Sequence, residues 1–215
     1  MPNTILLDLD GTIADSFCGI ANSILYSLDK LGIDAPPRES LRSFVGPPLL
    51  DEFKRRFGLN DETAREAVRL YREYYPQKGI YEQTMIADTV ELLTTLKTEG
   101  YRICLATSKP HEYAEKILGY FKIENYFDEV FGATMDGRIS DKAQIIRLAL
   151  DGTGTAPDEC VMIGDRFHDV DGAHKCGVKC IGVLSGYGSR KELEDCGADF
   201  IAERLSDIPR ILRIM

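Results

Sequence analysis

Short apolar runs alternate with helical segments along the chain from about residue 85 to its end. The expected strands are 101–106, 129–133, 160–164, 179–184 and 199–202, and the expected helices are 88–99, 142–151, 169–176 and 190–196. Strands that alternate with helices of this length are typical of a parallel sheet with helices on both faces. The pattern therefore predicts an α/β fold with a doubly wound parallel sheet.

A further apolar run, Thr4–Leu7, opens the chain and is expected to join the same sheet. Between it and the alternating region, the segment from about 16 to 80 contains only helix-like patterns. One helix from 16 to 31 has apolar residues at spacings of three and four, and two more follow within the segment. The chain is thus predicted to form a core of residues 1–15 and 82–215, interrupted by an α-helical cap of residues 16–81.

Two carboxylates, Asp8 and Asp10, follow the first strand directly. In open α/β sheets, ligands bind at the carboxyl ends of the strands. Carboxylates at this spacing repel each other unless a cation lies with them, and a hard oxygen site favours Mg²⁺. Considered alone, the stretch also fits a strand that leads into an ordinary Asp-Gly turn.

Other strands of the predicted sheet end in polar residues as well. Thr107 and Ser108 follow the run 101–106, and Asp165 and Asp169 follow the run 160–164. Each has a structural alternative, because hydroxyl and carboxyl side chains also cap helices. Lys142 lies at the start of a helix, which is electrostatically unfavourable unless an anion is present. Together, these residues predict one polar site along the carboxyl edge of the sheet.

The composition limits the partners, metal sites and location that we expect for the protein. The formal net charge of −9 argues against nucleic acid or an anionic membrane as the main partner. The six cysteines fit no common zinc pattern and several lie in apolar runs, so we expect reduced, buried thiols. No apolar run approaches the roughly 20 residues that span a bilayer. We expect a cytoplasmic protein that is a monomer or a homodimer.

The ordered set of motifs resembles that of the haloacid dehalogenase (HAD) superfamily. Four stretches carry the resemblance: Asp8-Leu9-Asp10-Gly11-Thr12, Thr107-Ser108-Lys109, Lys142, and Gly164-Asp165 with Asp169. The helical insert is similar to that superfamily's α-helical cap, and the likeness covers essentially the whole chain. Within the superfamily, Phe44-Val45-Gly46-Pro47-Pro48 resembles the phosphoglycolate phosphatase-like group. The implied fold is a Rossmann-like HAD core with an inserted cap.

The resemblance implies a magnesium-dependent phosphatase. Asp8 would attack phosphorus to form an aspartyl-phosphate, and Asp10 would protonate the leaving alcohol and then activate water. Thr107, the Ser108 N–H and Lys142 would hold the phosphoryl oxygens. These roles agree with the physics, since a carboxylate attacks a phosphate dianion only when its charge is neutralised.

By the same resemblance, Asp165 would bind Mg²⁺ together with Asp8 and the backbone carbonyl of Asp10. Asp169 would support the metal from outside its ligand shell or hold the lysine. Substrate choice is expected to depend on the cap, where the candidates are Arg42, Phe44, Gly46 and Lys78.

The predicted substrate is a small phosphorylated metabolite. Phosphoglycolate is the first candidate by resemblance, but Met85–Asp88 lacks the Pro-Gly that many relatives carry there. A nucleoside 5′-monophosphate and a β-phosphoglucomutase-like phosphomutase reaction remain alternatives. Asp10 argues against the true dehalogenases, which need no acid–base residue at this position. A phospho-accepting signalling domain is a further class, but its phosphorylated aspartate lies on a mid-chain strand with no cap after it.

Overall fold

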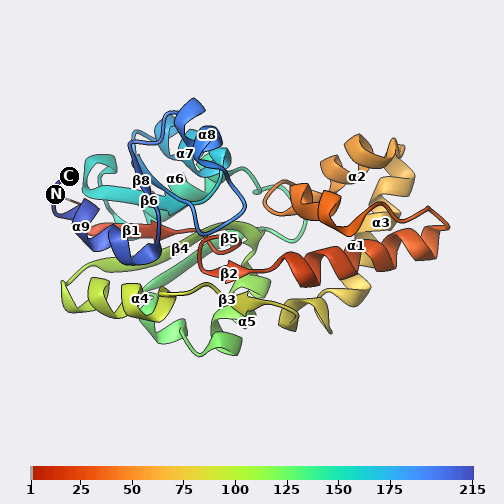
Figure 1. The fold of residues 1–215 in the computed structure, drawn as a ribbon, viewed down its shortest axis with the longest axis horizontal. Helices are drawn as coiled ribbons and strands as arrows, with labels where there is room; N and C mark the ends of the chain where they lie inside the picture. The colour runs from red at the N-terminus through yellow and green to blue at the C-terminus, as the bar shows by residue number, and fades with distance from the viewer. Residues whose placement is uncertain (1) are drawn as a thin grey trace. The chain divides into compact units, whose positions relative to one another are not determined.

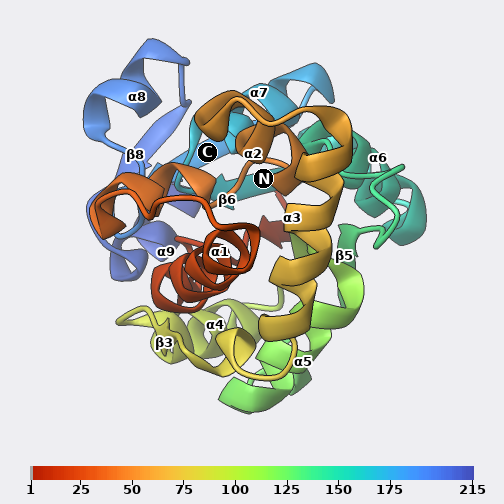
Figure 2. The same cartoon turned by 90° about the vertical axis from the view of Figure 1, so that its right-hand side faces the viewer.

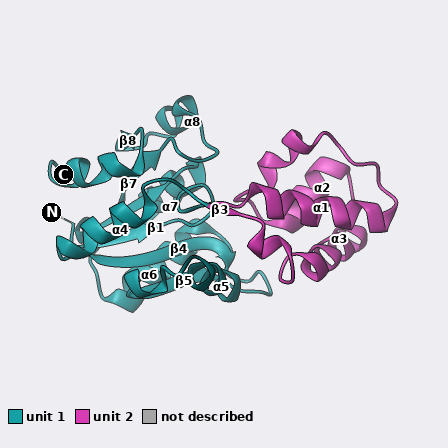
Figure 3. Ribbon diagram, turned by 60° about the horizontal axis from the view of Figure 1, so that its bottom comes forward, with its two compact units in different colours: residues 1–14, 85–215 teal, residues 15–84 magenta. Residues whose placement is uncertain are grey.

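The computed structural model describes residues 2–215, which divide into two compact units. Unit 1 comprises the chain up to Ala14 together with Met85–Met215, and unit 2 comprises Asp15–Thr84 (Figure 3). The expected cap, residues 16–81, falls within unit 2.

Unit 1 is built on one parallel sheet of six strands in the order β5-β4-β1-β6-β7-β8 (Figure 1). The strands are β1 (Thr4–Leu7), β4 (Arg102–Pro110), β5 (Glu129–Ala133), β6 (Cys160–Gly164), β7 (Lys179–Val183) and β8 (Phe200–Ala202). Strand β1 lies in the middle and pairs with β4 on one side and β6 on the other. From β1 the chain adds β4 and β5 on one side of the sheet and then β6, β7 and β8 on the other. Ligands bind in such sheets at the carboxyl ends of the strands where this change of direction occurs, which here are β1, β4 and β6.

Helices cover both faces of this sheet. They are α4 (Thr89–Thr98), α5 (His111–Phe121), α6 (Lys142–Thr153), α7 (Phe167–Lys175), α8 (Arg190–Asp195) and α9 (Ile208–Leu212), with 3₁₀ turns at Glu124–Tyr126, Pro157–Glu159 and Leu205–Asp207. Figures 1 and 2 show α6 and α7 on one face and α4 and α5 on the other. This arrangement confirms the predicted α/β fold with a parallel sheet covered by helices.

The core of unit 1 follows from the alternation of side chains along the central strands. Leu6 is paired in register with Cys104 on β4 and Met162 on β6, and all three are fully buried. They belong to one apolar cluster with residues of α6 and α7, such as Ile146 and Val170. Because both faces of the sheet are covered, the strands are apolar at nearly every position and read as continuous hydrophobic runs.

Between β2 (Ala14–Asp15) and β3 (Thr84–Met85), all regular elements of unit 2 are helices. Its elements are α1 (Phe17–Leu31), a 3₁₀ helix (Arg38–Phe44), α2 (Leu49–Phe57), α3 (Asp61–Tyr74) and a 3₁₀ turn (Gly79–Tyr81). Helices α1 and α3 pack side by side (Figure 2). Gly32 ends α1 in the left-handed conformation, and the Asn60 side chain caps α3 by accepting the Thr63 N–H at 2.9 Å.

Two short strands, β2 (Ala14–Asp15) and β3 (Thr84–Met85), pair with each other where the chain passes between the units.

One expectation about the strands of unit 1 was wrong in its bounds. The strand was expected to end at 106, but β4 continues through Pro110 and α5 begins at His111. Within residues 2–215, no helix is long and apolar enough to cross a membrane.

Candidate active site

Adjacent parallel strands bring the predicted site residues to one edge of the sheet. Asp8 follows β1, Thr107 lies near the end of β4, and Asp165 follows β6. The Asp8 N–H donates to the carbonyl of Ile163 over 2.9 Å, which continues the β1–β6 ladder to the first site residue. The strand order therefore places these side chains together, although more than 50 residues separate neighbours such as Thr107 and Asp165 in the sequence.

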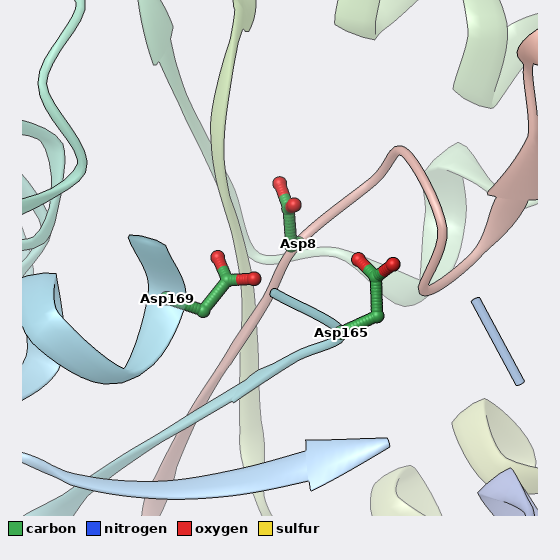
Figure 4. Close-up of side chains that lie close together, drawn as sticks. All are labelled: Asp8, Asp165 and Asp169. Carbon is green, nitrogen blue, oxygen red and sulfur yellow. The ribbon is translucent and has the colours of Figure 1, made fainter. Parts of the chain in front are cut away.

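Three carboxylates form a buried cluster at this edge. Asp8, Asp165 and Asp169 each have an oxygen within 4.8 Å of the others, and all three residues are buried. Figure 4 shows Asp8 on the loop after β1, Asp165 after β6 and Asp169 on α7, with their carboxylates facing a common space. Burial raises the pKa of Asp8 and Asp165, and the charge of Asp169 raises both further. Such a cluster needs positive charge.

Lys142 supplies part of that charge from the first position of α6. Its Nζ lies 2.8 Å from Asp8 Oδ1 and 2.8 Å from Asp169 Oδ1, and it donates to the Ala106 carbonyl at 3.0 Å. An ammonium group has three protons, so all of them are engaged. Burial opposes the charge on Lys142, but Asp169 and Asp8 outweigh it and raise the pKa of the lysine.

One oxygen of the Asp165 carboxylate has no hydrogen-bond partner among the described residues. Asp165 Oδ2 accepts the Tyr187 N–H at 2.6 Å, whereas the buried Oδ1 has no hydrogen-bond partner among residues 2–215. Asp169 differs, because its Oδ2 accepts the Arg166 N–H at 3.1 Å and its Oδ1 faces Lys142. An unpartnered, buried carboxylate oxygen beside other carboxylates is a suitable donor for a hard divalent cation such as Mg²⁺. The residues present therefore fit the metal.

Asp10 lies apart from this cluster. Its carboxylate forms an ion pair with Lys109, with Asp10 Oδ2 and Lys109 Nζ 2.9 Å apart. Its side chain is therefore not among the clustered carboxylates, and the expected metal contact of this residue is its backbone carbonyl. The sequence motif included Lys109, but no role was expected for it.

Thr107 and Ser108 lie at an irregularity in the pairing of β4 with β5. The pairing between the two strands is irregular after Thr107, and Gly132 of β5 allows the backbone at Lys109 and His111 to approach closely. Thr107 is buried, and its Oγ1 accepts the Lys109 N–H at 3.2 Å. A hydroxyl that accepts one hydrogen bond still carries a proton that it can donate. Ser108 is half-buried beside Thr107.

A loop after β7 forms part of the site and was missed by sequence reasoning. Gly186 lies against the Gly11 carbonyl and the Asp165 carboxylate, and Gly188 lies against the Asp165 carbonyl, with no space for a Cβ at either position. Glycines spaced in this way after a strand are a signal for close backbone approach, which could have identified the loop.

The four cap candidates lie in unit 2. The Phe44 side chain is buried and packs against Phe53 and Phe57, at ring-centroid distances of 5.4 and 5.9 Å. The Arg42 guanidinium lies 4.5 Å from the Phe17 ring centroid, and Lys78 lies 5.6 Å from that of Tyr74. Gly46 has φ of +105°, a value that favours glycine. A role of these residues in substrate choice stays a prediction.

Comparison with known proteins identifies the family. The model of the haloacid dehalogenase-like hydrolases matches residues 5–183. A 5′-nucleotidase of Pseudomonas aeruginosa is 43% identical over 89% of this chain and 86% of its own length. The tyrosine-protein kinase PtkA of Mycobacterium tuberculosis is 38% identical over 87% of this chain, which spans 64% of that relative.

A solved structure described as a predicted phosphatase from Clostridium acetobutylicum superposes with a TM-score of 0.96 at 39% identity, and all of both chains is covered. These matches confirm the resemblance and the expectation of a phosphatase-type enzyme. The chain belongs to the haloacid dehalogenase-like hydrolase family.

Proposed function

We propose that this enzyme is a Mg²⁺-dependent phosphatase that hydrolyses a small phosphoester through an aspartyl-phosphate on Asp8. The observation that carries the proposal is the charge balance of the buried site. The three clustered carboxylates of Asp8, Asp165 and Asp169 face the ammonium group of Lys142, which leaves two negative charges that one divalent cation would balance. Mg²⁺ bound at Asp8, Asp165 and the Asp10 carbonyl would neutralise charge on the phosphoryl group under attack.

In the first step, an Asp8 carboxylate oxygen bonds to phosphorus while the bond from phosphorus to the leaving oxygen breaks. The protonated Asp10 carboxyl gives its proton to that oxygen, and the alcohol leaves. In the second step, a water oxygen bonds to phosphorus while the bond from phosphorus to the Asp8 oxygen breaks, and Asp10 takes a proton from the water. Phosphate is released and the Asp8 carboxylate and the protonated Asp10 are regenerated, so a covalent intermediate divides one difficult displacement into two easier ones.

The other buried groups have supporting roles in this proposal. The Thr107 hydroxyl and the Ser108 N–H hold phosphoryl oxygens, and the Lys142 ammonium exchanges one of its three protein contacts for a phosphoryl oxygen. Asp169 holds Lys142 at 2.8 Å beside Asp8, so that the lysine lies where negative charge develops. Residues 16–81 are proposed to act as the cap that selects the leaving group.

A nucleoside 5′-monophosphate is the substrate we propose. The support is the 43% identity to a protein named 5′-nucleotidase, which extends over 89% of this chain. A solved structure described as a predicted phosphoglycolate phosphatase is 22% identical to this chain, and that similarity concerns the fold alone.

The test begins with D8N and p-nitrophenyl phosphate. We expect no measurable phosphate release from D8N, and loss of wild-type activity in EDTA that added Mg²⁺ restores. D158N, which changes an exposed aspartate of unit 1 in the same way, should retain wild-type activity. Unchanged activity in D8N would exclude the mechanism.

Substrate choice is tested with a panel of nucleoside monophosphates, phosphoglycolate and sugar phosphates, compared by kcat/KM. The highest value is expected for a nucleoside 5′-monophosphate. Interconversion of sugar phosphate isomers without phosphate release would replace the phosphatase by a phosphomutase.

A further inference from the structure

Lys109 is a second buried lysine of the site. The residue is 7% exposed and lies two positions after Thr107 on β4. Removing an ammonium group from water costs several kcal/mol unless an opposite charge lies beside it. That charge is Asp10, with side-chain exposures of 5% for the lysine and 10% for the aspartate. The pair is therefore well shielded from solvent.

The backbone around both residues fits this contact. Asp10 lies in a tight turn after β1, in which the Gly11 N–H donates to the Ala14 carbonyl at 2.8 Å. Lys109 lies beyond the last regular pair of β4 with β5, on the strand adjacent to β1. The ion pair thus joins the turn after β1 to the end of the neighbouring strand.

The two lysines serve different carboxylates. Lys142 contacts Asp8 and Asp169, and Lys109 contacts Asp10. The contact with Lys109 is made by Asp10 Oδ2, 2.9 Å from Lys109 Nζ. The other oxygen, Oδ1, is buried and has no hydrogen-bond partner among the residues that the structure describes.

We propose that Lys109 is a positioning residue for the acid–base carboxyl of Asp10. It holds Oδ2 and thereby leaves Oδ1 as the oxygen that exchanges a proton with the leaving group and with water. It also keeps the Asp10 carboxylate away from the cluster of Asp8, Asp165 and Asp169. This inference rests on the proposed function, because it assigns Lys109 a part in that mechanism.

A lysine that binds phosphate and a lysine that positions the general acid would affect different substrates when removed. A lysine that binds the phosphoryl group directly would affect all phosphate monoesters alike. A lysine that positions the general acid matters most when the leaving group is basic and needs a proton. Phenyl phosphate and p-nitrophenyl phosphate distinguish these roles, because they are nearly equal in shape but differ in leaving-group basicity.

The experiment compares kcat/KM for these two substrates in wild type and K109Q. The ratio of phenyl phosphate to p-nitrophenyl phosphate should fall about tenfold, within the range of roughly 10²–10⁴ that general acid catalysis contributes. Inhibition by inorganic phosphate should stay within about threefold of wild type, since that ligand has no leaving group. Equal losses on both substrates, or phosphate inhibition weakened in parallel, would overturn the proposal.

The ratio of two substrates does not depend on the fraction of enzyme that is folded. K97Q is the matched control, because it removes a lysine of unit 1 that pairs with Asp128 at 2.6 Å outside the site. Its ratio should equal that of wild type, and a ratio as low as that of K109Q would contradict a specific role of Lys109.

A second pair of variants, D10N and D10N/K109Q, covers the case in which K109Q alone does not fold. The double variant leaves no unpaired buried charge between these two residues. If Lys109 acts through Asp10, removing it from D10N should change kcat/KM for phenyl phosphate less than about threefold. A further tenfold loss would show that Lys109 acts independently. Activity in D8N would instead exclude the proposed function itself, so the two failures are distinguishable.

Discussion

Tyr187 donates its backbone N–H to Asp165 Oδ2 over 2.6 Å, and the glycines on both sides of Tyr187 pack against the same aspartate. This loop thus contacts the carboxylate through its backbone. One oxygen of Asp165 is held by the backbone, and the other is left for a metal. The geometry of the candidate metal site therefore depends on a segment that contributes no proposed ligand.

The first prediction concerns Gly186. In G186A the new Cβ would overlap the Gly11 carbonyl and Asp165 Oδ2, so the loop and the aspartate must move apart. We expect a loss of about 1–3 kcal/mol in the free energy of unfolding and weaker Mg²⁺ binding. Denaturant unfolding and isothermal titration calorimetry measure the two effects. G119A is the control, because a Cβ at this position meets no atom within 4 Å. Alanine in place of this glycine within helix α5 should raise the free energy of unfolding by about 0.5–1 kcal/mol. Unaltered Mg²⁺ binding in G186A would contradict the positioning role of the loop.

The second prediction concerns the charge of Asp165. Burial and Asp169 raise its pKa well above the usual value, so ionisation of this group destabilises the metal-free fold. A group with a raised pKa stabilises the fold below its unfolded pKa, and this contribution is lost as the pH rises through the folded pKa. At neutral pH in EDTA, D165N should therefore be about 1–3 kcal/mol more stable than wild type.

Added Mg²⁺ should reverse this order. Thermal unfolding of wild type is expected to shift upward with Mg²⁺, while D165N shows little shift, because a ligand stabilises only the fold that binds it. The side-chain amide oxygen that D165N introduces can still accept the Tyr187 N–H, so the loop contact is preserved. An equal Mg²⁺ shift in both proteins would place the metal away from Asp165.

The third prediction concerns the pH dependence of stability at Asp199. Burial opposes ionisation of this residue, but the Cys180 N–H and His174, each 2.9 Å from Oδ2, hold its pKa below the usual value. The stability from a depressed carboxyl pKa is present above the unfolded pKa and is lost as the pH falls through the folded pKa. D199N should therefore be about 1 kcal/mol less stable than wild type at pH 7, and the difference should begin to fall near pH 4 and vanish only below the lowered pKa of Asp199.

Denaturant unfolding at a series of pH values measures this difference. D195N is the control, since Asp195 forms an exposed pair with Lys191 that should contribute little at any pH. A difference between D199N and wild type that stays constant down to low pH would exclude the linkage.

The fourth prediction separates packing from substrate choice in unit 2. Phe44 is 2% exposed within the aromatic cluster, so F44A should cost about 3–5 kcal/mol of stability and F44L less. We expect F44L to keep the wild-type ranking of substrates by kcat/KM, and R42A or K78A to change it. A changed ranking in F44L, with R42A and K78A unaltered, would assign the specificity to Phe44 instead.

Much of the fold could be read from local patterns. Strands such as β1 and β6 are buried on both faces, and their apolar runs are visible in the sequence without any knowledge of their neighbours. The carboxylates at their ends, Asp8 and Asp165, could be expected to meet because parallel strands share one carboxyl edge. Lys142 could be singled out by its unfavourable position at a helix N-terminus.

The pairing of charges was decided only by the tertiary structure. Lys109 and Lys142 are both lysines beside polar motifs, and nothing local indicates that one contacts Asp10 and the other Asp8 and Asp169. The reason is that ion pairs depend on strand order and register, which join residues about 100 positions apart, such as Asp10 and Lys109. Local periodicity carries no information about those neighbours. The sequence alone thus determined which groups line the edge of the sheet, and the tertiary structure determined which of them hold one another.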